Sequence, residues 1–348
     1  MSINAMNSAI FTVAQRARPW RTRRAAMLGW CAALIAAVGA ATLAHAQSYP
    51  TRTVRLVVPY NAGGATDNIA RMLAERLGAR MGQTVIVENK GGAGGIIGTD
   101  AVAKAPPDGY TLAVTLSASL LTNQFLYEKL PYNAQRDLAL VTRIANAPIV
   151  LVVHPSVPAN NAAELMQYIS NNKKRVSYGS WGIGSYPHLA GAHMSLVQQA
   201  DMSHIAYKGE APMLQDLIGG QIQFAYASVP SAKAHIEAGK LKLIGVTGTK
   251  RLAVLPNAPT LLEQGLKDEV YSIVGFIGVA APANTPKAIV QQIAREIQAV
   301  CETKDVAERI TAMGFSVVAD SPDEFATSYK RELPVWERLV KQSGAKLE

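Results

Sequence analysis

Residues 54–77 read VRLVVPYNAGGATDNIARMLAERL and predict the first structural unit of the fold. The run 54–58 is apolar and rich in β-branched residues, which predicts a buried strand. From Asp67 to Leu77, apolar side chains recur at the spacing of one helical face, and Gly78 is expected to end that helix. A loop with two adjacent glycines joins the two. The stretch therefore predicts a strand, a glycine loop and a helix, in that order.

The same alternation of strand and helix continues along the chain. Further strands are expected at 84–88, 110–116, 149–153, 176–180, 221–227, 241–246 and 272–280. Further helices are expected at 162–170, 187–198, 212–218, 231–238, 286–301, 306–313 and 322–341. Alternation of this kind is typical of an α/β fold, with mostly parallel sheets that helices cover on both faces.

The N-terminal residues have the features of an export signal. Five arginines between Arg16 and Arg24 precede an almost wholly apolar run, 27–43, and the small-x-small pattern Ala44-His45-Ala46 follows. We therefore expect a signal peptide, residues 1–46, cleaved to give a periplasmic protein. The alternative is a permanent membrane anchor, for which the apolar run is only marginally long enough. The export route, Sec or twin-arginine, stays open.

Cleavage would change what the composition implies. It would leave 302 of the 348 residues and remove five arginines and no acidic residue, so the net charge would fall from +9 to +4. No lysine and arginine stripe interleaved with aromatic residues remains, which argues against nucleic-acid binding. Cys301 becomes the only cysteine, so no intramolecular disulfide is expected. A chain of about 300 residues usually forms two lobes.

Common catalytic and cofactor motifs are absent from the sequence. The glycine run 91–98 is not a dinucleotide fingerprint, because Ile97 stands where the last glycine should fall. No phosphate-binding GxxxxGK[ST] run and no HExxH spacing occurs, and Ser185 is not in a GxSxG elbow. We therefore expect no cofactor, no metal and no enzymatic activity.

Two glycine loops share one design. The first, 59–67, reads PYNAGGATD, and the second, 180–188, reads SWGIGSYPH; each lies between a predicted strand and a predicted helix. In open α/β sheets such loops lie at the carboxyl ends of strands, where ligands bind. Glycines let the backbone approach a ligand, and the N–H groups of a first helical turn favour an anion. Each loop alone could be an ordinary turn, but one in each lobe would hold a carboxylate from both sides.

Four polar side chains in or near these loops have two possible roles each. Asp67 could stabilise its helix start or accept a hydrogen bond from a ligand. His188 could stabilise a helix start or donate to a carboxylate. Ser185 could cap its helix or contact the ligand. Tyr207 could reach the cleft or pack in the core.

Short motifs along residues 49–348 together resemble one family. They include Tyr49-Pro50, Gly63-Gly64-x-Thr66-Asp67, Val87-Glu88-Asn89-Lys90, Pro107-Asp108-Gly109-Tyr110, Gly184-Ser185-x-x-His188, Tyr207-Lys208-Gly209 and Ala281-Pro282-Ala283-Asn284-Thr285-Pro286. In this combination and order, the motifs resemble those of the Bug-type extracytoplasmic solute receptors of the tripartite tricarboxylate transporter family.

The resemblance implies a two-lobed periplasmic binding protein, type II-like, that closes on its ligand as a Venus flytrap does. Lobe 1 would comprise residues 49–148 and 274–348, and lobe 2 residues 149–273. The resemblance also implies a small carboxylate ligand (a dicarboxylate, an amino acid or an aromatic acid) and handover to membrane transporter subunits; we expect a monomer. The expected ligand-binding residues are Tyr60, Asn61, Gly63, Gly64, Thr66, Asp67, Ser119, Gly182, Gly184, Ser185, His188, Tyr207 and Ser228.

Two other functions stay open on the sequence alone. An exported hydrolase would use Ser185 and His188, although no third member of a triad and no oxyanion hole is evident. A receptor that signals to a membrane sensor would need the same closed, liganded surface as a transport receptor.

Overall fold

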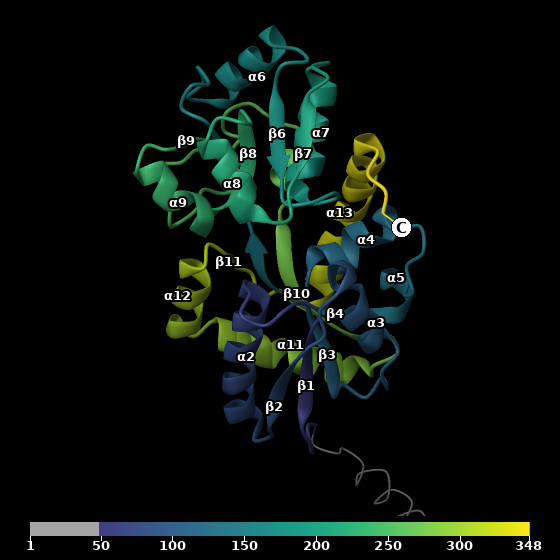
Figure 1. Cartoon of the computed structure of the whole chain (residues 1–348). Coiled ribbons are helices and arrows are strands. Elements are labelled where there is room, and N and C mark those ends of the chain that lie inside the picture. The colour runs from purple at the N-terminus through teal and green to yellow at the C-terminus, as the bar shows by residue number, and fades with distance from the viewer. Residues whose placement is uncertain (1–48, 348) are drawn as a thin grey trace, which may run out of the picture. The chain divides into compact units, whose positions relative to one another are not determined.

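The computed structural model describes residues 49–347, and the residues from Arg52 onward form one compact unit. The predicted signal peptide, residues 1–46, lies outside the described residues. Two β-sheets organise the unit, and helices flank both of them (Figure 1). No helix in the described part of the chain is long and apolar enough to cross a membrane.

The first sheet has six strands in the order β11-β4-β10-β3-β1-β2. Its strands are β1 (Val54–Val58), β2 (Val85–Asn89), β3 (Thr111–Leu116), β4 (Leu138–Ala147), β10 (Gly275–Pro282) and β11 (Ser316–Val317). The helices that belong to this half are α2 (Ala65–Met81), η1 (Ala93–Gly95), α3 (Ile96–Ala103), η2 (Ala118–Thr122), α4 (Asn123–Leu126), α5 (Ala134–Asp137), α11 (Lys287–Cys301), α12 (Lys304–Ala312) and α13 (Pro322–Ser343).

The second sheet has five strands in the order β7-β6-β8-β5-β9. Its strands are β5 (Ile149–Val153), β6 (Ser177–Ser180), β7 (Ser203–Ala206), β8 (Phe224–Ser228) and β9 (Lys242–Val246). The helices of this half are α6 (Ala162–Asn171), α7 (Tyr186–Val197), α8 (Glu210–Ile218), α9 (Val229–Glu237) and α10 (Glu269–Ser272).

The α/β class is confirmed, but both sheets are mixed, so the expectation of mostly parallel sheets is wrong. β1 is parallel to β2 and β3, and β6 is parallel to β7 and β8. In contrast, β10 is antiparallel to β3 and β4, β11 is antiparallel to β4, and β5 is antiparallel to β8 and β9. Strands β4, β5 and β10 flank the passages of the chain between the sheets, and only Pro148 separates β4 from β5. A strand that enters a sheet from the other half needs no helical crossover, so it is free to run antiparallel.

Helix α2 runs past the residue at which the sequence predicts its end. It continues to Met81, and Gly82, with φ 64°, closes it in the left-handed conformation typical of a helix C-terminus. Gly78 lies inside the helix, at a point where the following chain packs closely against the helix. A Cβ at Gly78 would lie 3.3 Å from the backbone oxygen of Gln83, which is tighter than ordinary contact.

Strand β4 has no counterpart among the predicted strands. It is ten residues long and contains Arg143, which is only 5% exposed. Both Nη atoms of Arg143 donate to Oε1 of Glu332 in α13 at 3.1 Å. The predicted strand 272–280 also begins too early, because Ser272 ends α10 and β10 starts at Gly275. A buried charged residue whose partner lies on a distant helix interrupts the apolar run by which a buried strand is predicted from sequence.

The core extends from one half of the unit into the other. One hydrophobic cluster contains Val57 and Ala113 from the first sheet and Phe224 and Tyr226 from the second. Helix α13 packs on β4 and also contacts α7, and its Trp336 belongs to the same cluster (Figure 1). A second cluster covers the other face of the five-stranded sheet. The two halves therefore share packed side chains at the base of the space between them.

Candidate functional site

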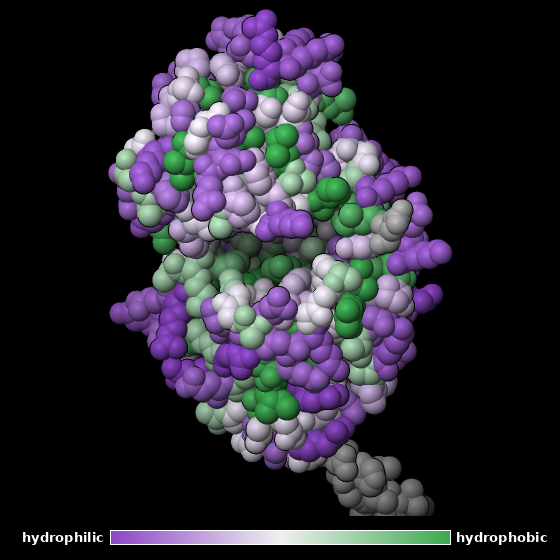
Figure 2. Space-filling model, viewed as in Figure 1, coloured by the Kyte–Doolittle hydropathy of each residue, from purple (hydrophilic) through white to green (hydrophobic). Residues whose placement is uncertain are grey.

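A cavity of about 610 Å³ opens between the two sheets. The end of β3, Ala147 of β4 and the start of β10 border it from the first sheet, and Ile149 and Ser228 border it from the second. Figure 2 shows the hollow at this level, with a mainly hydrophobic floor. Pockets of this volume are typical of small-molecule sites.

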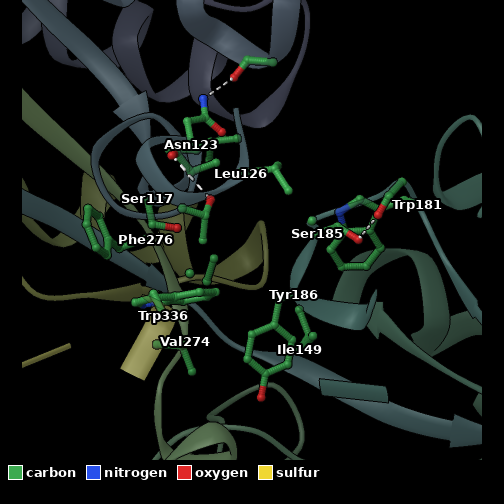
Figure 3. A pocket seen from close by; sticks show the side chains of 18 of the residues that line it. Ser117, Asn123, Leu126, Ile149, Trp181, Ser185, Tyr186, Val274, Phe276 and Trp336 are labelled. Carbon is green, nitrogen blue, oxygen red and sulfur yellow. Dashed lines mark hydrogen bonds between the residues drawn. The ribbon is translucent and has the colours of Figure 1, made fainter. Parts of the chain in front are cut away.

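The first wall of the cavity follows β3. It consists of Ser117, the π-helical turn η2 and α4, which begins at Asn123. Asn123 is buried, and its Nδ2 donates to the backbone oxygen of Gly94 at 3.2 Å. Leu126 of α4 lies on the same wall (Figure 3). Because π-helical turns occur frequently at functional sites, this wall is a candidate ligand surface.

The second wall of the cavity is the second glycine loop, which follows β6. Trp181, Gly182, Gly184 and Ser185 line the cavity opposite the first wall (Figure 3). Ser185 is the N-cap of α7, and its Oγ donates to the backbone oxygen of Gly182 at 2.6 Å. This wall brings the start of α7, with the positive end of its dipole, to the cavity.

The two walls approach each other at one point. Gly184 has φ +76°, and a Cβ built on it would lie 2.3 Å from Cδ2 of Leu126. A glycine is therefore required here for two reasons, its backbone conformation and the close approach of α4.

The first glycine loop lies elsewhere. The cavity lining does not include Tyr60, Asn61, Gly63, Gly64, Thr66 or Asp67. Asp67 is 2% exposed and accepts hydrogen bonds from the N–H of Gly63 (2.8 Å), Nε of Arg71 (3.0 Å) and Nδ2 of Asn89 (2.9 Å). Burial alone would raise the pKa of Asp67, but these donors hold it below the usual value. Its partners all belong to its own loop, helix and neighbouring strand.

Three more of the predicted residues have partners within the protein and do not line the cavity. The hydroxyl of Ser119 lies 3.1 Å from that of Tyr60. The hydroxyl of Tyr207 donates to Asp216 at 2.7 Å. Nδ1 of His188 accepts from the N–H of Gly184 at 3.1 Å and so supports the second glycine loop from behind. Of the expected set, the cavity lining brings together Gly182, Gly184, Ser185 and Ser228.

Aromatic side chains that the sequence analysis does not select form much of the cavity lining. They are Tyr127, Trp181, Tyr186, Phe276, Phe315 and Trp336. Trp181, Tyr186, Phe276 and Trp336 are labelled in Figure 3. The rings of Tyr186 and Trp336 meet edge to face, with centroids 6.0 Å apart. Nε1 of Trp336 is buried and has no hydrogen-bond partner among the described residues. These residues come from segments that are far apart in the sequence, so no local motif indicates that they meet.

Glu210 is a second kind of lining residue that the sequence analysis does not select. It lies in the first turn of α8, directly after the Tyr207-Lys208-Gly209 motif, and its carboxylate reaches the start of α9. There it accepts hydrogen bonds from the backbone N–H and the hydroxyl of Ser228, and from the hydroxyl of Ser231. The position after a glycine at a helix start could have indicated this residue.

Comparison with known proteins identifies the family of this chain. Residues 69–345 match the family model described as the tripartite tricarboxylate transporter family receptor, TctC. The chain belongs to the TctC family. It is therefore a solute receptor of the periplasmic binding protein type and not an enzyme.

Individual TctC-type relatives are similar over most of their length. Protein BugT of Bordetella pertussis is 34% identical, with 94% of this chain and 99% of BugT covered. The structure of the periplasmic binding protein BugD has a TM-score of 0.69 at 34% identity, covering 86% of this chain and 100% of that one. The R. palustris protein Rpa4515, solved with adipate, has a TM-score of 0.72 at 32% identity, with the same coverage.

The hydrolase alternative has no support in the geometry of this TctC receptor. The Ser185 hydroxyl donates to a backbone carbonyl, and His188 Nδ1 accepts from a backbone N–H. Neither contact pairs a nucleophile with a general base, which is the relationship that such catalysis needs.

Proposed function

We propose that this TctC receptor captures a small carboxylic acid in the cavity between its two sheets and hands it to a membrane transporter. One observation carries the proposal: the second glycine loop and the start of α7, with the positive end of its dipole, line the cavity. In such a cavity a carboxylate is held by neutral donors and by a helix dipole. The adipate in Rpa4515 supports the ligand class.

We also propose that ligand binding closes two lobes, residues 49–148 with 274–348 and residues 149–273. The cavity lies where these segments face each other, and Gly184 already approaches Leu126 across it. Ligand contacts to both walls would be stronger in the closed arrangement, and only such differential contacts can drive closure.

Among the thirteen expected residues, we propose direct ligand contact for Gly182, Gly184 and Ser185. We propose a supporting role for the first glycine loop and for Ser119, His188, Tyr207 and Ser228. The hydrogen bonds of Ser119 with Tyr60 and of His188 with Gly184 fix the positions of the two walls. Those of Asp67, Tyr207 and Ser228 fix the elements around the walls.

Calorimetric titration with a panel of mono- and dicarboxylates, amino acids and aromatic acids tests the ligand class. The expected result is saturable binding of at least one acid, with a smaller radius of gyration in X-ray scattering of the complex. Failure of every acid to bind would overturn the ligand class. Binding with superimposable scattering profiles would overturn lobe closure.

Export is part of the same proposal, because a receptor of this kind acts outside the cytoplasm. We propose that a signal peptidase cleaves after Ala46. N-terminal sequencing of the protein from a periplasmic extract should begin at Gln47. An intact apolar segment in the membrane fraction would overturn this.

A further inference from the structure

One charged side chain distinguishes the cavity. Among the described residues that line it, Glu210 is the only carboxylate, and none is lysine, arginine or histidine. An ionised ligand therefore meets one negative charge and no positive side chain inside the cavity. For a receptor of acids, this is an unexpected arrangement.

The contacts of Glu210 are those that a bound carboxylate would make. The Ser228 backbone N–H and hydroxyl and the Ser231 hydroxyl all donate to it, the two hydroxyls at 2.8 Å. Ser228 is the N-cap of α9, so the carboxylate also lies at the positive end of a helix dipole. The protein's own side chain thus occupies the donors at this end of the cavity.

A ligand with two carboxylates would meet this arrangement unfavourably. Its first carboxylate can lie at the positive end of the α7 dipole. At α9, its second would find the donors already taken by the carboxylate of Glu210. It would also share a partly dehydrated cavity with the Glu210 charge, without a cation to offset the repulsion. Like-charge juxtaposition of this kind is a common way to exclude a wrong ligand.

We infer that Glu210 is a specificity-determining residue that excludes dicarboxylates, so that this receptor takes monocarboxylates. This inference rests on the proposed function, since it assumes that acids bind in this cavity. The uncharged remainder of the ligand packs against the aromatic lining formed by Trp181, Tyr186, Phe276 and Trp336.

Matched pairs of acids that differ only in the second carboxylate test the inference: butyrate with succinate, hexanoate with adipate, and octanoate with suberate. Calorimetry on the protein from Gln47 onward should show the monocarboxylate of the tightest-binding pair at least about 10-fold tighter than its partner. In Glu210→Gln, which removes the charge but keeps the shape, this ratio should fall at least about 10-fold.

A matched control separates the cavity charge from the net charge. Glu237 lies exposed at the end of α9, paired with Lys233 at 3.8 Å, and does not line the cavity. Glu237→Gln changes the net charge equally and should leave the ratio unchanged. Circular dichroism melts confirm that each variant is folded, and Glu210→Ser is the second variant if Glu210→Gln is not.

The outcomes are distinguishable. A wild-type preference for the dicarboxylates, or an unchanged ratio in a folded Glu210 variant, overturns the role of Glu210 while leaving the carboxylate receptor intact. If no acid binds to any variant, the proposed function fails and this inference fails with it.

Discussion

The imidazole rings of His188 and His204 stack with their centroids 3.9 Å apart and an angle of 13° between their planes. His188 accepts a hydrogen bond from Gly184 of the second glycine loop, and Nε2 of His204 lies 2.7 Å from the hydroxyl of Ser180, where that loop begins. The stacked pair thus supports the cavity wall from behind. Stacking at this distance disfavours protonation of both rings at once, since two imidazolium charges would repel each other, and burial lowers the pKa of both rings.

Acidification should weaken the stacked pair. Burial, together with the neighbouring His188, lowers the pKa of His204 from 6.5 to about 4. Between about pH 4 and pH 6.5 the unfolded chain binds a proton at His204 that the folded chain does not. The contribution of neutral His204 to the free energy of unfolding is therefore complete above pH 6.5 and decreases as the pH falls. Asp320 has the opposite effect on stability. Burial raises its pKa to about 6, so below that pH the folded chain binds a proton more tightly than the unfolded chain does, and this contribution to stability grows as the pH falls.

Comparison with His204→Gln isolates the histidine from Asp320. The destabilisation caused by this substitution, measured by urea unfolding, should be largest at pH 7 and should shrink steadily towards pH 4.5. A difference between wild type and variant that stays constant across this range would contradict the role of the neutral pair.

Substitution of Gly184 should impair the cavity more than the positive φ alone explains. Gly184→Ala places a Cβ in left-handed backbone and against Leu126, whereas Gly239, with φ +67°, has no atom within 4 Å of such a Cβ. Gly239→Ala should therefore cost about 1–2 kcal/mol of unfolding free energy and leave ligand binding unchanged. Gly184→Ala should cost more and lower ligand affinity at least about 10-fold.

Removal of the opposing side chain tests the cause. In the double variant Gly184→Ala with Leu126→Ala, the clash is gone, and part of the lost affinity should return. No recovery in titration calorimetry would mean that the backbone strain, and not contact between the walls, produces the effect.

Ser185→Ala should loosen the second wall. Loss of the hydroxyl's bond to the Gly182 carbonyl should cost about 1 kcal/mol of stability and lower ligand affinity about fivefold. Ser343 makes an equivalent bond to the carbonyl of Val340, outside the cavity lining. Ser343→Ala should lower stability alone, and equal affinity losses in both variants would show that the effect is not local.

The Arg143–Glu332 pair should be among the costliest contacts to break. Both partners are buried, with Glu332 5% exposed, and Arg143 also stacks over the Phe276 ring at 4.3 Å. Glu332→Gln leaves the guanidinium without its counter-ion and should cost about 3–5 kcal/mol. Glu308→Gln, which removes an exposed pair with Lys304 at 3.8 Å, should cost less than about 1 kcal/mol. Chemical unfolding of both variants checks the contrast.

Local pattern predicts the amphipathic helices and the apolar strands. The amphipathic helices α2, α11 and α13 and the apolar strands β1 and β5 follow from periodicity and turn residues. β4 does not, because its buried Arg143 is satisfied by Glu332, 189 residues away. Local pattern also does not predict strand direction, because the direction depends on where the chain passes from one sheet to the other.

The two glycine loops show that a sequence motif alone does not locate the site. Their sequences predict the same role, yet only the second lines the cavity. Both loops follow a strand one place outside those that border the cavity, β1 beside β3 and β6 beside β8, so the difference depends on tertiary packing and not on strand order. Glu210 and Trp336 are hidden for the same reason, because their importance depends on tertiary neighbours.

The positions of the tryptophans have a practical consequence for optical spectroscopy. Of the four in the sequence, Trp20 and Trp30 precede the expected cleavage after Ala46, while Trp181 and Trp336 both line the cavity. In the processed protein, every indole emitter would then lie at the binding site, and ligand entry should alter the intrinsic fluorescence with no background from elsewhere. The two emitters also stand on different structural elements, the second glycine loop and α13. Single Trp→Phe variants would therefore report separately on the glycine loop and on the helix.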